Sequence, residues 1–181
     1  MKFTSLAIPD ILLCEPKILR DERGTFYESF NQKVFDDTIG KPVRFVQNNH
    51  SLSVKGVLRG MHYQIKQAQG KLVCVTHGEV FDVSVDMRKS SPTFGKWVGE
   101  HLTASNHAQL WIPEGFAHGF VVLSETADFF YKTTDYWAPE YERRLAWDDA
   151  DVAIDWPLLE FPTLSAKDTN AVSLVYAESF A

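Results

Sequence analysis

Short segments rich in β-branched and aromatic residues recur along most of this sequence, and clusters of Gly, Pro, Asn or Ser separate them. Such side chains fit the pleated surface of a sheet, whereas the intervening residues favour turns. Many short strands with few helices predict an all-β sandwich, jelly roll or barrel. The expected strands cover residues 25–30, 44–50, 71–87, 108–113, 119–123 and 128–137.

The longest of these segments, residues 71–87, is expected to hold two strands. Gly78 divides it and can adopt the positive φ that a tight turn requires. Apolar and polar residues alternate in FDVSVD, which places Phe81, Val83 and Val85 on one face. Two glycine-flanked histidine segments, one in each half of the strand region, favour a jelly roll whose interior carries the functional site.

Two further segments have the pattern of a helix. Residues 31–40 end at a glycine suited to cap a helix, and residues 165–179 open with Ser165 and carry Asp168 three residues on. The second arrangement is close to a capping box. No internal repeat or linker divides the chain, so its 181 residues predict one domain, 1–181.

The composition argues against several classes of protein. A net charge of −6 disfavours a nucleic-acid partner. No segment reaches the length of a membrane span, and Pro9 and Asp10 break the N-terminal apolar run before it could form the core of a signal peptide. Cys14 and Cys74 are too few for a disulfide framework, so we expect free thiols in the reducing cytoplasm. The chain can still form a positive cleft from Arg23, Arg44, Arg59, Lys66 and Lys71.

His62, within VLRGMHYQ, is the first candidate for chemistry. A metal site would need three or four ligands, but Gln64 stands where a second histidine would be expected, and Gln is a poor ligand for transition metals. His118 and Glu79 leave that ligand set incomplete. A second interpretation makes His62 a general base, because a neutral imidazole can accept a proton near working pH. A third makes it a half-buried structural histidine.

The general-base interpretation needs partners for the charge that it creates. Lys71 and His118 are candidates, because an enolate oxygen requires a cation or a hydrogen-bond donor. Tyr131 could return a proton from another side. Each candidate also has a structural explanation: Arg23 as a solvated turn residue, Tyr131 as aromatic core, Asp168 as a helix cap. The three amides of residues 47–49 suit either turns or the recognition of a ring or sugar.

Several long motifs together resemble one enzyme family, the dTDP-4-dehydrorhamnose 3,5-epimerases of nucleotide-sugar metabolism. The resemblance runs from about residue 3 to Trp156 and resumes at LSAKD, residues 164–168. The motifs that carry it are RGTFYESF, FVQNNHSLSVKGVLRGMHYQ, QGKLVCV, GEVFDVSVDMRKSSPTFGKWVG, QLWIPEGFAHGFVVLSE and DFFYKTTDYWAPEYE.

The resemblance implies a cupin-type jelly roll, also called a double-stranded β-helix, with a few short peripheral helices. It implies a homodimer that uses neither a metal nor an organic cofactor, with a dTDP-4-keto-6-deoxy sugar as the substrate. By the same resemblance, His62 is the base and Asp168 orients it, Tyr131 is the proton donor, and Lys71 stabilises the enolate. The implied substrate-binding residues are Arg23, Phe26, Glu28, Gln47, Asn48, Asn49, Arg59, Lys71, His118, Trp137, Glu142 and Lys167.

One position departs from the family pattern. The family usually has Tyr-Tyr where this chain has Tyr136-Trp137. Tryptophan can stack on a thymine ring as tyrosine does, but it lacks the phenolic hydroxyl. The substitution therefore disfavours proton donation from position 137 and favours Tyr131.

Other functions remain open at this level. Inversion at C3 alone or at C5 alone, or ketoisomerisation of a related sugar, would need only small changes in the pocket. A non-catalytic cupin that binds sugar nucleotides would keep the arginines and the stacking aromatic residue, but would not need His62, Asp168, Tyr131 and Lys71 together. A metal-dependent cupin oxygenase is the remaining alternative.

Overall fold

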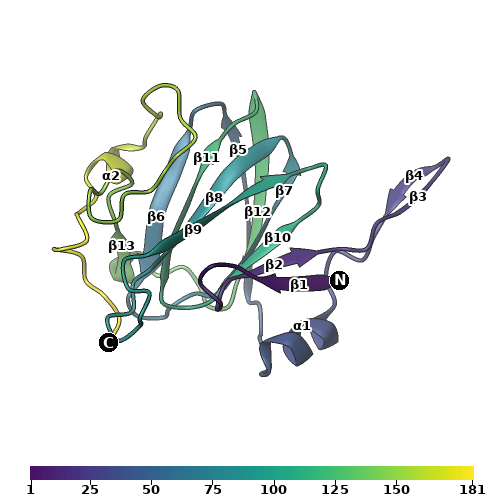
Figure 1. Cartoon of the computed structure of the whole chain (residues 1–181), viewed down its shortest axis with the longest axis horizontal. Coiled ribbons are helices and arrows are strands. Elements are labelled where there is room, and N and C mark those ends of the chain that lie inside the picture. Colours follow the sequence, from purple (N-terminus) through teal and green to yellow (C-terminus); the bar gives the residue numbers. More distant parts are fainter.

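The computed structural model describes residues 1–181 and consists mainly of two antiparallel sheets that face each other (Figure 1). The six-stranded sheet has the order β1 (Lys2–Ser5), β2 (Leu12–Glu15), β10 (Gln109–Ile112), β7 (Lys71–His77), β12 (Thr126–Thr133) and β5 (Gln47–Val54). The five-stranded sheet has the order β13 (Glu142–Arg144), β6 (Leu58–Gln64), β11 (Phe116–Val122), β8 (Glu79–Asp86) and β9 (Trp97–Thr103). Apart from β1–β2 and β8–β9, the neighbours in both sheets are not consecutive along the chain, which confirms the predicted all-β jelly roll.

The two sheets enclose a hydrophobic core. Val73, Leu110 and Phe129 enter it from the six-stranded sheet, and Val80 and Leu102 enter it from the five-stranded sheet. All five are at most 1% exposed. Burying one such side chain contributes roughly 1.5–3 kcal/mol, so this core holds the two sheets together.

The predicted alternation in FDVSVD is confirmed. Phe81, Val83 and Val85 share a second cluster on the outer face of the five-stranded sheet, beneath the C-terminal segment that carries Leu145 and Ala177. The other face of β8 points inward, and its polar residues are also buried: Asp82, Ser84 and Asp86 are all 0% exposed. Both faces of β8 are therefore covered, and polar groups lie inside the barrel.

Strand boundaries differ from the sequence-based ones where tertiary pairing decides them. The 71–87 segment divides at Gly78, with φ +77°, into β7 and β8 as expected. β11 begins at Phe116, before the expected residue 119, because it pairs with β8 from Phe116 to Val122. That extension places His118 within the sheet. The expected strand 44–50 lies three residues later, in β5, and the 128–137 strand ends at Thr133.

One of the two expected helices is confirmed over its whole length. α1 (Gln32–Ile39) is capped by the side chain of Asn31 and ends at Gly40, which has φ +79°. The helix expected over 165–179 is wrong beyond its first turn, because α2 spans only Ala166–Thr169. After it, the backbone of Val172 pairs with Arg144 and Ala146 beside β13, and this pairing replaces helical hydrogen bonds.

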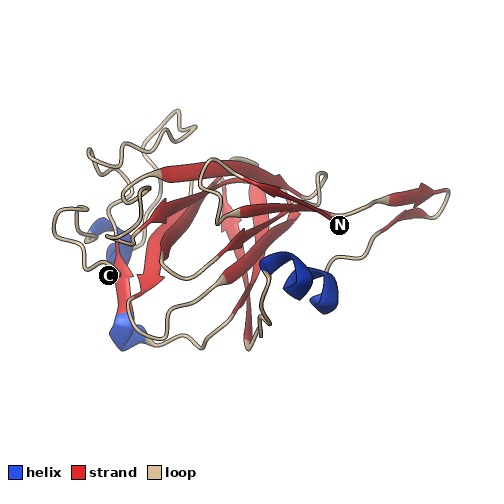
Figure 2. Ribbon diagram, turned by 60° about the horizontal axis from the view of Figure 1, so that its bottom comes forward, coloured by secondary structure: helices blue, strands red, loops and turns tan.

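A hairpin of β3 (Leu19–Asp21) and β4 (Gly24–Phe26) extends away from the barrel (Figures 1 and 2). Every residue of its two strands is exposed. The strand expected over 25–30 is thus limited to β4 at its start. The helices, including the short η1 (Pro139–Tyr141), lie at the periphery, and none has the length and apolar character needed to cross a membrane.

Two glycines allow β6 and β11 to approach closely where the histidines lie. A Cβ atom on Gly60 would lie 2.5 Å from the Cα of Gly119, and a Cβ on Gly119 would lie 2.6 Å from the carbonyl oxygen of Arg59. Gly60 also has φ +130°, which favours glycine. The strands pair irregularly here, with His62 opposite His118 and Arg59 opposite Phe120.

Candidate active site

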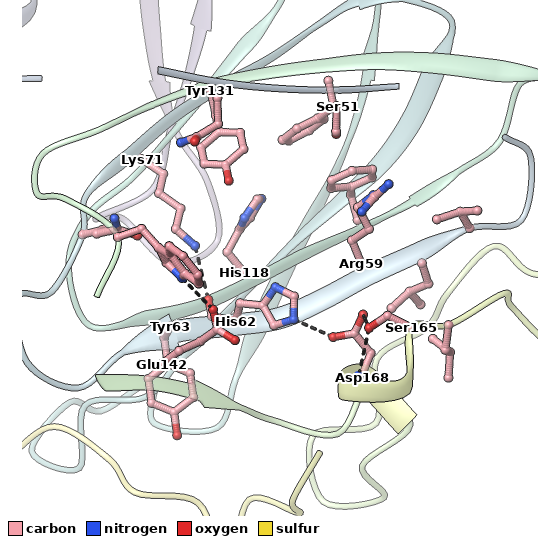
Figure 3. Close-up of a pocket in the computed structure, with 18 of the residues that line it drawn as sticks. Ser51, Arg59, His62, Tyr63, Lys71, His118, Tyr131, Glu142, Ser165 and Asp168 are labelled. Atoms are coloured by element: carbon pink, nitrogen blue, oxygen red, sulfur yellow. Dashed lines mark hydrogen bonds and ion pairs between the residues drawn. The ribbon is translucent and has the colours of Figure 1, made fainter. Parts of the chain in front are cut away.

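A cavity of about 540 Å³ opens between the two sheets beside the hydrophobic core (Figure 3). Phe120 and Phe129, whose ring centroids are 4.1 Å apart, belong both to the core and to the cavity wall. A volume of this size is typical of sites for small molecules. The polar residues in its wall include Asn49, Arg59, His62, Gln64, Lys71, His118, Tyr131, Glu142, Ser165 and Asp168.

His62 lies on β6 and faces this cavity with one ring nitrogen free. Its Nε2 is 2.5 Å from Oδ1 of Asp168, so the proton on Nε2 is donated to that carboxylate. Nδ1 then carries the lone pair and points into the cavity (Figure 3). The side chain of His62 is 35% exposed, whereas that of Asp168 is only 4% exposed. An imidazole held in this way can accept a proton from a bound molecule.

Asp168 reaches His62 from the short helix α2 in the C-terminal part of the chain. Its second oxygen, Oδ2, accepts a hydrogen bond of 2.8 Å from Ser165 Oγ, which also caps the helix. Burial alone would raise the pKa of Asp168, but the hydrogen bonds from His62 and Ser165 lower it overall. The carboxylate therefore stays ionised and can stabilise a positive charge on His62.

Tyr131 and Lys71 enter the cavity from the six-stranded sheet, across from His62 (Figure 3). Burial raises the pKa of Tyr131, so its hydroxyl remains protonated and available as a donor. Burial lowers the pKa of Lys71 to about 8, while the charges of Asp82 and Glu142 oppose that shift. Lys71 Nζ donates a hydrogen bond of 3.3 Å to the backbone carbonyl of His62. A base and an acid thus face each other, with an ammonium beside them.

A second pair of histidine and carboxylate joins His118, in the same wall, to Asp82, which is buried behind it. His118 Nε2 is 2.9 and 3.1 Å from the two carboxylate oxygens of Asp82. Burial lowers the pKa of His118 and raises that of Asp82, while the attraction between the two opposes both shifts. The sequence-based candidates included His118 but not Asp82. The alternation in FDVSVD could have indicated Asp82, because it places this residue on the face of the strand that does not carry Phe81, Val83 and Val85.

Trp137 and Glu142 form one rim of the cavity. The indole Nε1 of Trp137 donates to Glu142 Oε2 at 2.9 Å, and Arg144 Nη2 donates to Glu142 Oε1 at 2.8 Å. The backbone N–H of Trp137 donates to Gln47 Oε1 at 3.0 Å. Trp137 is 54% exposed, so its ring is held at its edge and leaves a face free for stacking.

The structure brings most of the expected residues together but not all of them. Asn49, Arg59, Lys71, His118, Trp137 and Glu142 line the cavity with His62, Tyr131 and Asp168. The expected residues outside its wall are Gln47, Asn48, Lys167, Arg23, Phe26 and Glu28.

Arg23 and Phe26 lie on the projecting hairpin. The Arg23 side chain pairs with Asp21, with Nη2 and Oδ2 2.6 Å apart. Glu28 follows the hairpin and accepts a hydrogen bond from Asn31. No group of three or more His, Cys, Asp or Glu side chains is arranged to hold a metal ion.

The chain is similar to known proteins over most of its length. Residues 5–175 match the family model for dTDP-4-dehydrorhamnose 3,5-epimerase. An enzyme of that name from Pseudomonas aeruginosa is 61% identical over 180 residues, covering 99% of each chain. A dTDP-4-dehydrorhamnose 3-epimerase from Streptomyces niveus is 36% identical, covering 98% of this chain and 86% of its own.

A solved structure has nearly the same fold. The Legionella pneumophila dTDP-6-deoxy-D-glucose-3,5-epimerase, in complex with dTDP-4-keto-L-rhamnose, superposes with a TM-score of 0.94 at 55% identity. The match covers 97% of this chain and 93% of that one. With the family model matching most of the chain as well, this chain belongs to the dTDP-4-dehydrorhamnose 3,5-epimerase family.

Proposed function

We propose that this chain inverts C3 and C5 of dTDP-4-dehydro-6-deoxy-D-glucose and so forms dTDP-4-dehydro-L-rhamnose. Family membership and 61% identity to a 3,5-epimerase support this substrate and outcome. The observation that carries the proposal is the placement of His62 and Tyr131 on opposite sheets across one cavity, with Lys71 beside them. Inversion requires a proton to leave one face of the sugar and return to the other.

The first step is removal of a carbon-bound proton. The C4 ketone acidifies the hydrogens at C3 and C5, because the electrons of either C–H bond can move onto the ketone oxygen. His62 Nδ1 takes the proton, and the resulting imidazolium is stabilised by Asp168 at 2.5 Å. The sugar becomes an enolate whose former stereocentre is planar.

The second step returns a proton from the other side. Tyr131, kept protonated by burial, donates its hydroxyl proton to the opposite face of the carbon and inverts it. The imidazolium of His62 then loses its proton to solvent and the phenolate of Tyr131 regains one, so that the pair can act at the second carbon. Lys71, as an ammonium, stabilises the negative charge on the C4 oxygen while the enolate exists. The nucleotide is expected to extend toward Arg59, whose guanidinium can bind phosphate oxygens, and toward the exposed face of Trp137.

Reaction in deuterated water tests this mechanism. Incubation with the 4-keto sugar should place solvent deuterium at both C3 and C5, measured by proton NMR and mass. Absence of label at both carbons would rule out the enolate. Tyr131→Phe should still exchange protons but form little inverted product, because deprotonation by His62 precedes donation. Normal inversion by that variant would remove Tyr131 as the donor.

Inversion at C3 alone is the second candidate. The Streptomyces niveus 3-epimerase aligns with almost the whole chain at 36% identity, so the fold serves both outcomes. The higher identity to 3,5-epimerases favours double inversion. Deuterium at C3 without deuterium at C5 would assign this chain to the mono-epimerases.

We also propose a homodimer in which the β3–β4 hairpin of each protomer reaches the other's cavity. The hairpin is exposed throughout and carries Arg23 and Phe26, which are expected to bind substrate but lie outside the cavity of their own chain. Mixing two inactive variants, Arg23→Ala and His62→Ala, should restore activity, since a mixed dimer has one intact site. Light scattering should report two chains per particle. A monomer, or no recovery after subunit exchange, would contradict the exchange of hairpins.

The thiols support a reducing compartment, and we propose the cytoplasm. Cys14 and Cys74 are free, and burial raises their pKa to about 12 and about 11. Such thiols are poor nucleophiles at neutral pH and do not depend on oxidation. Fractionation of cells that express the protein would test this location.

A further inference from the structure

We propose that Asp82 is a positioning residue that holds His118 and supplies the buried counter-charge for Lys71, without touching the substrate. This inference rests on the proposed epimerase function. Asp82 is 0% exposed and lies behind the cavity wall rather than in it. Asp82 must therefore act on the substrate indirectly, by way of His118 and Lys71, which do line the cavity.

The contact with His118 is direct. Both carboxylate oxygens of Asp82 lie within 3.1 Å of Nε2, which fixes the ring and keeps the proton on that nitrogen. Asp82 and His118 belong to the paired strands β8 and β11, so the ladder holds both backbones in place. Phe129 stacks on the ring of His118 from the other sheet, with centroids 6.0 Å apart. The orientation of His118 toward the cavity is thus set by Asp82 and by packing.

The influence on Lys71 is electrostatic. Lys71 is 8% exposed, and its ammonium hydrogen-bonds a backbone carbonyl, which carries no full charge. The cavity wall that Lys71 enters also carries His118 on β11, His62 on β6, Tyr131 on β12 and Glu142 on β13, and Asp82 on β8 lies behind it. The charges of Asp82 and Glu142 act on Lys71.

Of these five groups, only Asp82 and Glu142 provide negative charge at neutral pH. Glu142 already accepts hydrogen bonds from Trp137 and from the positive Arg144. Asp82 is bound to His118, whose pKa is lowered by burial, so that histidine tends to be neutral. The charge on Asp82 therefore opposes the loss of the Lys71 proton on burial, and the charge on Lys71 in turn opposes the rise that burial causes in the pKa of Asp82.

The consequence concerns the enolate. Its negative charge is stabilised by Lys71 only while Lys71 is protonated. Without Asp82, burial would favour the neutral amine at working pH, and the C4 oxygen would lose its cation. Asp82 is thus expected to determine the pH above which the enzyme stops working.

Asp82→Asn is the direct test, because the amide keeps the shape and its oxygen can still accept from His118 Nε2. We expect the alkaline limb of the kcat/KM profile to move down by about one pH unit. At pH 8.5 the rate should then fall to roughly a tenth of that of the unmodified enzyme. Ser84→Ala is the matched control: Ser84 lies on the same face of β8, is 0% exposed, and its Oγ has no hydrogen-bond partner. Its profile should not move.

The same substitution in a Lys71→Arg enzyme separates the effect of Asp82 on the charge of Lys71 from its effect on the orientation of His118. In a Lys71→Arg enzyme the cation cannot deprotonate near neutral pH, so adding Asp82→Asn should leave the alkaline limb in place. A loss of rate at every pH with an unmoved limb in the single Asp82→Asn variant would show that Asp82 only orients His118. That result would overturn the proposal that Asp82 is the counter-charge of Lys71.

NMR of the substrate-free protein gives a reading that does not depend on activity. Lysines labelled by ¹³C reductive methylation, with Lys71 assigned by Lys71→Arg, should show Lys71 titrating near pH 8 in the unmodified protein and lower in Asp82→Asn. A Lys71 that is already neutral at pH 7 in the unmodified protein would contradict the proposal, even if the variant failed to fold. Failure of the deuterium experiment with a normal Lys71 titration would reject the epimerase function alone.

Discussion

Two histidines of the cavity wall each pair with an aspartate through the same kind of contact, and the two pairs differ in their surroundings. In both, a carboxylate holds Nε2 of the ring, at 2.5 Å for His62 and Asp168 and at 2.9 Å for His118 and Asp82. The side chain of His62 is 35% exposed, whereas that of His118 is 8% exposed. The first pair combines a strand with a short C-terminal helix, and the second joins two paired strands.

The comparison teaches that burial assigns different roles to the same pair of residues. His62 can gain a positive charge because its ring reaches the cavity and Asp168 stays ionised. His118 pays a larger desolvation penalty, which lowers its pKa and favours a neutral ring. An accessible pair suits proton transfer, and a buried pair suits the positioning of neighbouring charges.

The largest expected effect is the loss of the accessible base. His62→Ala should reduce kcat by about 10³-fold or more and abolish deuterium exchange at both carbons, because no other group in the cavity can accept the proton at that position. His101→Ala is the control, since His101 forms an exposed pair with Glu79 on the outer side of the sheet, 2.8 Å apart. Exchange that persists in His62→Ala would transfer the role of base to another residue.

Asp168→Asn should have the next largest effect. The amide retains the size of the side chain but cannot stabilise the imidazolium, so kcat should fall by about 10²-fold with little change in KM. Ser165→Thr, which keeps the hydroxyl that donates to Asp168, should remain close to the unmodified enzyme. If Asp168→Asn raised KM and left kcat unchanged, Asp168 would be a binding residue instead.

His118→Ala should lose more stability and less activity than His62→Ala. It leaves Asp82 buried without its partner, which costs roughly 3 kcal/mol of unfolding free energy. The expected loss in kcat is smaller, about tenfold, because His118 does not move the proton. Urea unfolding of His62→Ala and His118→Ala side by side measures the contrast. Equal losses of stability in the two variants would show that the buried pair contributes no more to stability than the accessible pair.

The pH profile of the unmodified enzyme tests the role of Lys71 without any substitution. Burial lowers the pKa of Lys71 to about 8, and the protonated form is the one that stabilises the enolate. The value of kcat/KM should therefore decline above pH 8, by about tenfold for each further pH unit. The contribution of Lys71 to stability should show the opposite trend, rising between pH 8 and 10.5, because Lys71 binds a proton there in the unfolded chain but not in the folded one. Cys14 and Cys74 act against it above pH 9, because burial raises their pKa and they lose their protons first in the unfolded chain. A flat profile to pH 10 would exclude Lys71 as the titrating group.

The smallest expected effect lies at the rim, on the side of the accessible pair. Trp137→Phe keeps an aromatic face but removes the N–H that holds Glu142, so KM should rise by about threefold and kcat should change little. Trp137→Tyr should behave similarly if stacking dominates. A large fall in kcat in both variants would indicate that Trp137 and Glu142 act on His62 rather than on the nucleotide.

Much of this molecule follows from local patterns. Segments of β-branched and aromatic residues predict the strands, Gly78 predicts the turn between β7 and β8, and residues 31–40 predict α1 with its glycine cap. These features depend on the preferences of residues close together in the chain, which a sequence displays directly. The resemblance to a known family then named nine of the 21 residues that line the cavity, among them His62, Tyr131 and Asp168.

The tertiary structure alone decided which of those residues meet and how. Asp168 is 106 positions from His62, and Asp82 is 36 positions from His118, so no local periodicity could pair them. Pairing beside β13 also ended α2 after Thr169, against the helical pattern of the segment. The physical reason is that strand register and desolvation are properties of the assembled sheets. Register determines which side chains are in contact, and desolvation determines which groups carry charge.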